Sequence, residues 1–318
     1  MTASTGDPLE TAQQERADRP HAVPWRAVVV FVVLAFGLAW LIALPMWLAP
    51  GVSTAALMML APALATLAVV FGMRTPGRRR RRSLGIWPLR PAKRIVWFLV
   101  AGLFAPVVLV ALTVAVSAAL GWVKLDLAHF SGFAEMNAAA LPQGTDPVPP
   151  AVLIAVQLVL IPIMAIIPNS IFAFGEEIGW RGWLLPALTP LGTWPALVLS
   201  GTIWGLWHMP VTLLGHNFGL TDWRGVALMT VGGVAWGVLL GWTRLRTASV
   251  WPAVVAHGAL NASGGMVFWF FAAGTEPSLA LVNPMGVAGW IVLGVVIVLL
   301  ALTGQFRRQP ALAARPAR

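Results

Sequence analysis

The sequence contains no cysteine, and it has few charged residues for its length. Asp, Glu, Lys and Arg make up 10% of the 318 residues, and hydrophobic residues make up 58%, whereas charged residues make up about 25% of a soluble domain. The lack of cysteine excludes disulfide bonds and cysteine-ligated metals. The lack of charge excludes an ordinary soluble domain, and it predicts an all-α polytopic membrane protein.

The apolar segments follow one another with short gaps, and they approach or reach the roughly 20 residues needed to cross a bilayer. Pro162 and Pro168 predict a kink in the fourth segment, which would free backbone carbonyls near its end. Gly233, Gly237 and Gly241 repeat every four residues, which predicts close contact with a neighbouring helix. We expect about eight transmembrane helices, at approximately 27–49, 53–73, 95–120, 151–174, 194–214, 225–242, 250–271 and 286–303.

These segments divide the chain into five parts, of which the fourth segment to the seventh form the expected catalytic region. The loop after the third segment is rich in Pro and Gly, and an interfacial helix is expected within it at about 125–140. The expected parts are a disordered cytoplasmic tail (1–25), N-terminal transmembrane helices with a basic and an outer loop (26–150), a catalytic membrane domain (151–271), a last transmembrane helix (272–304) and a basic cytoplasmic tail (305–318).

The net charge of +10 comes from 21 basic and 11 acidic residues. Most of the basic residues, including the run Arg78–Arg82, lie beside apolar segments on the N-terminal side, where they act as topology signals. We therefore expect both termini in the cytoplasm of a bacterial cell, with the basic loop at the anionic leaflet of its plasma membrane. The bilayer is the expected partner of this charge, and nucleic acid is not.

Two adjacent carboxylates, Glu176 and Glu177, follow an apolar run, 151–174, that contains no charged residue. A carboxylate at such a position is costly unless it is paired, bound to a metal or in contact with water, so it marks a functional site. Glu177 and Arg181 are four residues apart on a helix, which predicts an ion pair. Glu176 lies about 100° round the helix from Glu177, so it would be left free to face the histidines of other segments.

Two of the five histidines, His208 and His257, lie inside apolar segments. His257 and Asn261 are four residues apart and share a helix face, as do Trp204 and His208, so the indole could support the imidazole. His21 falls in the tail, and His129 and His216 fall in loops, where they are expected to be ordinary surface residues.

Three kinds of chemistry suit these polar residues. Glu176, His208 and His257 could bind zinc or another divalent metal with a water in an open position. The same residues suit a metal-free site, where a Glu–His pair activates water and a His–Asn pair holds an oxyanion. They also suit a proton relay in a transporter.

The ordered set of motifs resembles the CPBP family of intramembrane proteases, which includes the type II CAAX prenyl endopeptidases and the bacteriocin-processing and self-immunity (Abi) proteins. The resemblance covers about residues 151–265. The motifs are Glu-Glu-x-x-x-Arg at Glu176, Glu177 and Arg181, an aromatic-x-x-x-His at Trp204 and His208, where Phe is common in place of Trp, and His-x-x-x-Asn at His257 and Asn261.

The resemblance implies an eight-helix membrane enzyme that hydrolyses a peptide bond within the bilayer. Members are usually labelled metalloproteases, although a glutamate-dependent mechanism without metal has also been argued. Prenylated CAAX proteins suit the eukaryotic branch, whereas a bacterial member would act on a peptide, a bacteriocin precursor or a membrane protein.

We expect an intramembrane endopeptidase, and the alternative is a transporter or a non-catalytic immunity or binding protein. In the first case, the expected catalytic residues are Glu176, Glu177, His208, His257 and Asn261. Glu176 is the expected general base and His208 its partner in holding the water. His257 and Asn261 are expected to stabilise the oxyanion, and Arg181 and Trp204 to give structural support.

Overall fold

The computed structural model describes residues 22–49, 51–142, 144–307 and 309. The expected tails at 1–25 and 305–318 lie almost entirely outside this described part. The helices, with π and 3₁₀ turns labelled η, are α2 (Trp25–Leu48), α3 (Ala55–Met58), α4 (Ala61–Leu67), η1 (Ala68–Gly72), α5 (Arg80–Ser83), α6 (Ala92–Ala119), α7 (Ser131–Ala140), α8 (Pro150–Met164), η2 (Ala165–Asn169), α9 (Ser170–Glu177), η3 (Ile178–Leu184), α10 (Leu185–Leu188), η4 (Thr189–Leu191), α11 (Thr193–Trp207), α12 (Met209–Thr212), α13 (Trp223–Thr247), α14 (Trp251–Ser263), η5 (Gly264–Phe268), α15 (Leu279–Val282) and α16 (Val287–Leu302).

The protein is an all-α polytopic membrane protein, as the composition predicts. The described residues form no β-strand, and one isolated β-bridge joins Leu125 to Phe271. Six helical segments are long and apolar enough to cross a bilayer: Trp25–Leu48, Ala55–Gly72, Ala92–Ala119, Pro150–Leu191, Trp223–Thr247 and Leu279–Leu302. The helix expected in the loop that follows α6 is present as α7.

The expected count of eight transmembrane helices is not confirmed, because two of the expected segments form shorter helices. The fifth is divided between α11, with 15 residues, and the short α12. Pro210 lies at the start of α12, where a proline is tolerated because its missing N–H has no helical partner. The seventh is α14, with 13 residues, which gives way to the 3₁₀ turns of η5 at Gly264 and Gly265.

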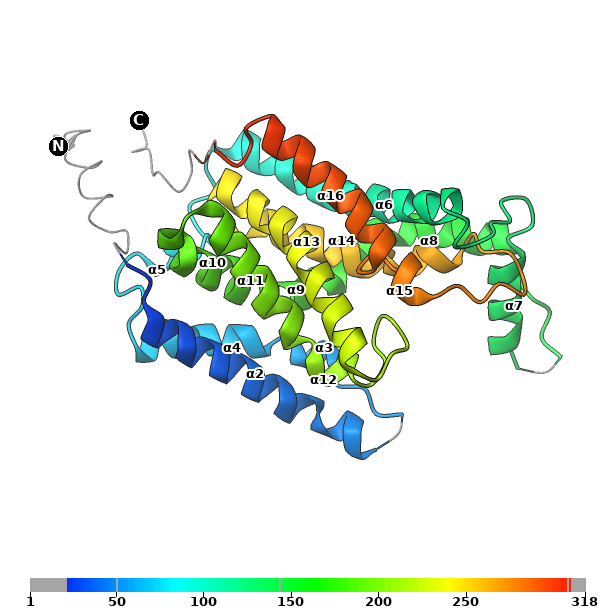
Figure 1. The fold of residues 1–318 in the computed structure, drawn as a ribbon, viewed down its shortest axis with the longest axis horizontal. Helices are drawn as coiled ribbons and strands as arrows, with labels where there is room; N and C mark the ends of the chain where they lie inside the picture. The colour runs from blue at the N-terminus through cyan, green and yellow to red at the C-terminus, as the bar shows by residue number, and fades with distance from the viewer. Residues whose placement is uncertain (1–21, 50, 143, 308, 310–318) are drawn as a thin grey trace, which may run out of the picture.

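The helices are arranged side by side in layers (Figure 1). The pair α2 and α4 forms one side, α6 and α16 form the other, and α9, α11, α13 and α14 lie between them. Because the central helices are covered on both sides, many of their side chains are buried within the protein. The candidate site residues Glu176, Glu177, His208 and His257 lie on or at the ends of these central helices.

Helices α11 and α13 are in close backbone contact, as the glycine repeat predicts. A Cβ added to Gly233 would lie 2.7 Å from the Cα of Gly205, and one added to Gly237 would lie 2.9 Å from the Cα of Gly201. Any side chain at these positions would therefore push the helices apart. This contact fixes α11, and with it Trp204, against the core of the protein.

The predicted kink in the fourth segment is present at Ile167, whose φ of −137° and ψ of 116° are not helical. The kink leaves the carbonyl of Ala165 free to accept a hydrogen bond from the Ser170 hydroxyl. Helix α14 approaches this point closely, because a Cβ on Gly258 would lie 2.4 Å from the Ala165 carbonyl oxygen. The kink therefore allows α14 to pack closely against the fourth segment at Gly258, the residue after His257.

Candidate active site

The two carboxylates end α9, where the chain continues into the π-helical turns of η3. The backbone around them is fixed by two glycines: a Cβ on Gly175 would lie 2.7 Å from the Met59 carbonyl oxygen, and one on Gly179 would lie 2.6 Å from Pro62 Cβ. Both glutamates are buried, at 1% exposure for Glu176 and 0% for Glu177. Buried carboxylates need partners, and each of the two has a different set.

Glu177 contacts two basic groups with one oxygen. Its Oε1 lies 2.7 Å from Arg181 Nη1, which confirms the ion pair predicted from their spacing, and 2.9 Å from His257 Nδ1. The expectation that Glu176 alone would face the histidines is therefore wrong, because Glu177 is the carboxylate that contacts His257. Its second oxygen, Oε2, is buried without a hydrogen-bond partner among the described residues.

Glu176 is held by two indoles. Its Oε2 accepts a hydrogen bond of 2.6 Å from Trp204 Nε1 and one of 3.2 Å from Trp180 Nε1. The indole of Trp204 therefore supports Glu176 through its N–H group, in addition to its predicted contact with the ring of His208. Oε1 of Glu176 makes no hydrogen bond within the described chain, so this oxygen is available to another donor.

Trp180 is a site residue that the sequence analysis missed. It is fully buried and packs edge-on against Phe31 of α2 and against Trp207 of α11. It lies four residues after Glu176, the same spacing that joins Glu177 to Arg181. The same spacing could have predicted this contact, as it predicted the pair of Glu177 and Arg181.

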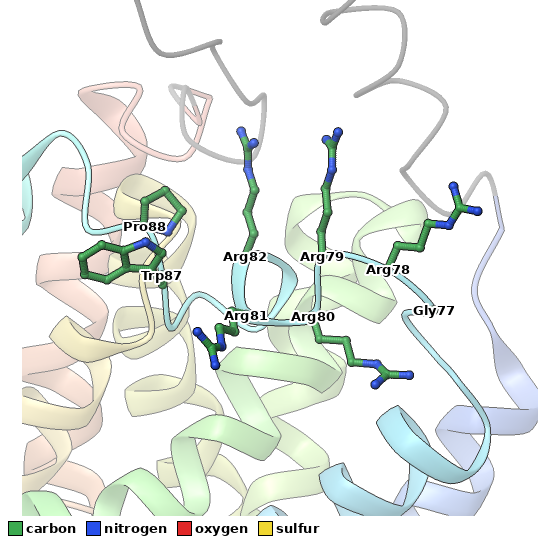
Figure 2. A pocket seen from close by; sticks show the side chains of 8 residues that line it. All are labelled: Gly77, Arg78, Arg79, Arg80, Arg81, Arg82, Trp87 and Pro88. Carbon is green, nitrogen blue, oxygen red and sulfur yellow. The ribbon is translucent and has the colours of Figure 1, made fainter.

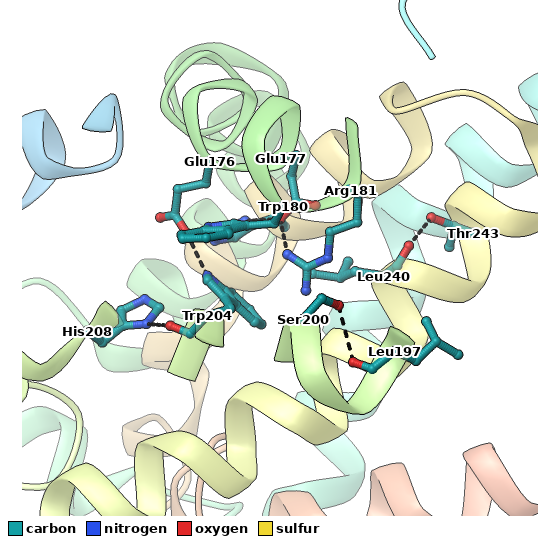
Figure 3. A network of polar contacts seen from close by, with 11 residues as sticks. Glu176, Glu177, Trp180, Arg181, Leu197, Ser200, Trp204, His208, Leu240 and Thr243 are labelled. Atoms are coloured by element: carbon teal, nitrogen blue, oxygen red, sulfur yellow. Dashed lines mark hydrogen bonds and ion pairs between the residues drawn. The ribbon is translucent and has the colours of Figure 1, made fainter. Parts of the chain in front are cut away.

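Trp204 lies at the centre of the site and joins its parts (Figure 3). The guanidinium of Arg181 lies over its ring, with Cζ 4.4 Å from the ring centroid, in cation–π geometry. The rings of His208 and His257 contact it edge-on, with centroids 5.6 Å and 5.4 Å from its own. The structure therefore gathers Glu176, Arg181, His208 and His257 around one buried indole.

His208 lies where α11 ends and α12 begins, and its ring has a defined orientation. Nδ1 lies 2.9 Å from the backbone carbonyl oxygen of Trp204. Because a carbonyl can only accept, Nδ1 carries the hydrogen and donates it. In the neutral ring, Nε2 then has a free lone pair, and this nitrogen makes no hydrogen bond within the described part of the chain.

Asn261 is not part of this buried cluster. It lies one helical turn beyond His257 on α14, but its side chain is exposed and makes no hydrogen bond with any described residue. Asn261 and His257 share a face of α14, as predicted. The Asn261 side chain does not, however, lie together with the other polar side chains of the site. His129 and His216, by contrast, are exposed loop residues, as expected.

A metal ion would need free donor atoms from Glu176, His208 and His257 around one position. Glu176 Oε2 is occupied by two indoles, and Nδ1 of each histidine is occupied by an oxygen acceptor. Among the described residues, no three His, Asp or Glu side chains are grouped closely enough to hold a metal ion. Glu176, His208 and His257 therefore do not have the expected metal-site geometry in this structure.

The family match covers the part of the chain that contains all of these residues. Residues 151–263 match the family model described as Type II CAAX prenyl endopeptidase Rce1-like. This segment belongs to the CPBP family. The CPBP segment runs from α8 to the end of α14 and includes every predicted site residue, from Glu176 to Asn261. Among curated proteins, none matches the chain.

The CPBP match supports an intramembrane protease of the CAAX type. The six apolar helices and this match together support an integral membrane protein. The matched segment contains the residues that carry the sequence resemblance.

Proposed function

We propose that the protein is an endopeptidase that cleaves a membrane-associated or lipophilic peptide with a water molecule activated by Glu176. The observation that carries this proposal is the difference between the two carboxylates. Both known contacts of Glu176 are made by Oε2, so Oε1 remains available to bind water. Glu177 has its partners in Arg181 and His257, and its remaining oxygen is fully enclosed.

His208 is the proposed second acceptor for the water. Its Nδ1–H donates to the Trp204 carbonyl, which leaves Nε2 as an acceptor. Water has two hydrogens, and two acceptors, Glu176 Oε1 and His208 Nε2, would orient its lone pair toward the substrate carbonyl. The shared contact of both residues with Trp204 supports this arrangement.

His257 is the proposed oxyanion donor, and it must be protonated to act in this way. Its Nδ1 contacts Glu177, so a hydrogen on Nε2 requires the imidazolium form, which an adjacent carboxylate stabilises. Glu176, Glu177, Arg181 and His257 then carry two negative and two positive charges. A balanced cluster of this kind is consistent with its complete burial.

Asn261 is the proposed second oxyanion donor. Its amide is exposed, and it has no hydrogen-bond partner within the described chain, so a substrate that reaches α14 from the outside can accept a hydrogen bond from it. A donor that binds only when the substrate arrives contributes to the transition state without stabilising the resting enzyme.

The reaction then proceeds in two balanced steps. Water oxygen bonds to the carbonyl carbon while one water proton moves to Glu176 Oε1, and the carbonyl oxygen becomes an oxyanion held by His257 and Asn261. The carbonyl then re-forms as the C–N bond breaks, and Glu176 returns the proton to the leaving amine. The general base is thereby regenerated.

The proposal is tested by the Glu176→Gln variant, which keeps the size of the side chain but cannot accept the proton. Its turnover of a verified peptide substrate in detergent or vesicles is expected to fall by about 10² to 10⁴. The matched control is Glu276→Gln, an exposed residue outside the family segment, which should keep the parent activity. Full turnover by Glu176→Gln on that substrate would overturn the assignment.

Whether the enzyme contains a metal ion is tested by a separate measurement on the same protein. Purified parent enzyme is analysed for bound metal and assayed before and after treatment with a chelator. Activity that is lost on chelation and restored by zinc would assign Glu176 Oε1 and the histidine Nε2 atoms to a metal, in place of a water held by side chains alone.

A further inference from the structure

Three polar residues interrupt the apolar run that precedes the two glutamates: Gln157, Asn169 and Ser170. The Ser170 hydroxyl has a structural role, because it donates to the Ala165 carbonyl at the kink. Asn169 precedes α9 without capping it, and its half-buried carboxamide makes no hydrogen bond within the described chain. A polar group without a partner is costly inside a bilayer. The carboxamide of Asn169 is therefore free to bind a ligand.

Asn169 lies on the side of α9 that carries Glu176. The backbone is helical from Asn169 to the end of α9, and seven residues make two turns of an α-helix, so residues 169 and 176 share a face. Ile171 lies on nearly the opposite side and is 62% exposed. Glu176 accepts a hydrogen bond from Trp204 of α11, so the face that it shares with Asn169 is directed toward the central helices.

Helix α14 carries a second amide without a partner, Asn261, at the same end of the site. Helices α9 and α14 run in opposite directions. Ala173 packs with Val254. Four residues further along α14, a Cβ added to Gly258 would lie 3.0 Å from the backbone nitrogen of Ser170, which is nearer the start of α9. Asn261 follows Gly258 by three residues, so it lies near the start of α9.

The site is closed at the glutamates and opens toward the two amides. Glu176 and His257 are buried, whereas Asn169 is half-buried and Asn261 is exposed. A peptide that approaches Glu176 from this end passes Asn169. Two turns of helix span about 10 Å, which corresponds to roughly three residues of an extended chain.

The two ends of α14 differ in chemistry. The start of α14 lies against the loop that follows η1, because Trp251 donates to the Ile86 carbonyl. This loop forms a basic pocket, and Figure 2 shows that the guanidinium groups of Arg78–Arg82 point in different directions. At the other end, Asn169 and Asn261 offer neutral carboxamides, each with a donor and an acceptor. A peptide main chain presents the same two groups in turn, so an extended peptide can form paired hydrogen bonds with such a side chain.

We propose that Asn169 is a substrate-binding residue that forms hydrogen bonds with the main chain of an extended peptide, about three residues from the bond that is cut. This inference rests on the proposed function, and it names the class of ligand as a peptide that is held by its backbone. It does not require Glu176 to be the general base, because the contact is remote from the reacting atoms.

The probes are the verified peptide substrate and its reduced-amide analogue, in which CH₂–NH replaces the scissile amide so that no mechanism can cleave it. Binding of the analogue to the purified full-length protein is measured by fluorescence anisotropy for the parent, Asn169→Leu and Asn169→Gln. The matched control is Gln157→Leu, which removes another half-buried carboxamide without a partner in the described chain, on the far side of the kink. A set of analogues N-methylated at one main-chain nitrogen each removes single N–H donors. Thermal melts verify that the variants are folded.

We expect Asn169→Leu to bind the analogue about tenfold more weakly, Asn169→Gln to recover part of the loss, and Gln157→Leu to stay within about twofold of the parent. KM for the substrate should change more than kcat, because the contact is equally strong in the ground state and in the transition state. In the parent, one N-methyl group about three residues from the scissile bond should weaken binding. Asn169→Leu should be insensitive to that same N-methyl group.

Unchanged binding by Asn169→Leu, or equal losses in Asn169→Leu and Gln157→Leu, would overturn the proposal. Weaker binding by Asn169→Leu with the parent's N-methyl pattern would also overturn it, because the residue would then only support the helix. The parent's own pattern provides a test that needs no variant, since equal tolerance of every N-methyl group would contradict the contact. Full turnover by Glu176→Gln, with binding that depends on Asn169, would remove the proposed base and leave this inference standing.

Discussion

Two arginine–carboxylate pairs of nearly the same length lie in opposite environments in this protein. Arg181 Nη1 lies 2.7 Å from Glu177, with both side chains buried, whereas Arg224 Nη2 lies 2.8 Å from Asp222, with side chains 61% and 41% exposed. At an exposed position, a charged side chain that loses its partner is solvated by water instead. In the protein interior, the remaining charged side chain has no water to solvate it. The distance between the atoms is thus a poor guide to the importance of a pair.

The pairs also differ in what else they contact. Arg181 lies over Trp204 in cation–π geometry, and Glu177 contacts His257, so the buried pair connects Trp204 with His257. Asp222 caps the first turn of α13 by accepting from the backbone N–H of Arg224, and the exposed pair therefore has a local role. The comparison leads to three predictions, in order of decreasing effect.

The largest effect is expected for Arg181→Ala. This change leaves Glu177 buried with a partner only in His257, and it should lower the free energy of unfolding by about 3–5 kcal/mol. Folded yield and thermal stability in detergent measure the loss, with Arg224→Ala as the matched exposed control, for which only a small change is expected. Normal stability of Arg181→Ala with loss of activity alone would instead identify the arginine as a substrate contact.

An intermediate effect is expected when one indole donor is removed from Glu176. Trp204→Phe keeps the aromatic ring but removes the 2.6 Å hydrogen bond to Oε2. A hydrogen bond to a charged group contributes about 1.5–3 kcal/mol, so turnover should fall about tenfold or more. The control is Trp207→Phe, which removes an indole bond to a backbone carbonyl of α2 instead. Equal losses in both variants would point to packing as the cause.

The smallest effect concerns the exposed pair and depends on pH. The hydrogen bond from Arg224 lowers the pKa of Asp222 below its usual value. A carboxyl group with a lowered pKa in the folded state stabilises that state above its unfolded pKa of about 4. This contribution is lost as the pH falls through the lower, folded value. The thermal midpoints of the parent and Asp222→Asn should therefore differ slightly at neutral pH and converge in acid. A difference that does not change with pH would contradict this account.

Much of the fold could be predicted because the patterns involved are local. The apolar segments, the kink at Pro168 and the glycine contacts of α13 each depend on a short stretch of sequence, and so does the Glu177–Arg181 pair. The number of membrane helices was harder to predict, because hydrophobicity does not show where Pro210 or Gly264 interrupts a helix.

The partners of the two glutamates could not be predicted from helix geometry alone. Our expectation placed Glu176 toward the histidines by assuming 100° per residue, but the chain enters the wider π-helical turns of η3 directly after Glu177. Which carboxylate meets His257 also depends on how α14 packs at the kink of the fourth segment. Such a contact is set by tertiary packing. The i to i+4 contact of Trp180 with Glu176, by contrast, could have been predicted from the sequence.

The central claim is that the two adjacent carboxylates have different roles, and one paired measurement tests it most directly. Turnover and folded yield are measured together for Glu176→Gln and Glu177→Gln. We predict that Glu176→Gln folds with the parent yield and binds substrate but fails to cleave it, whereas Glu177→Gln loses folded yield because Arg181 and His257 lose their counter-charge. Near-parent turnover by Glu176→Gln, with a well-folded but inactive Glu177→Gln, would show that Glu177 is the general base.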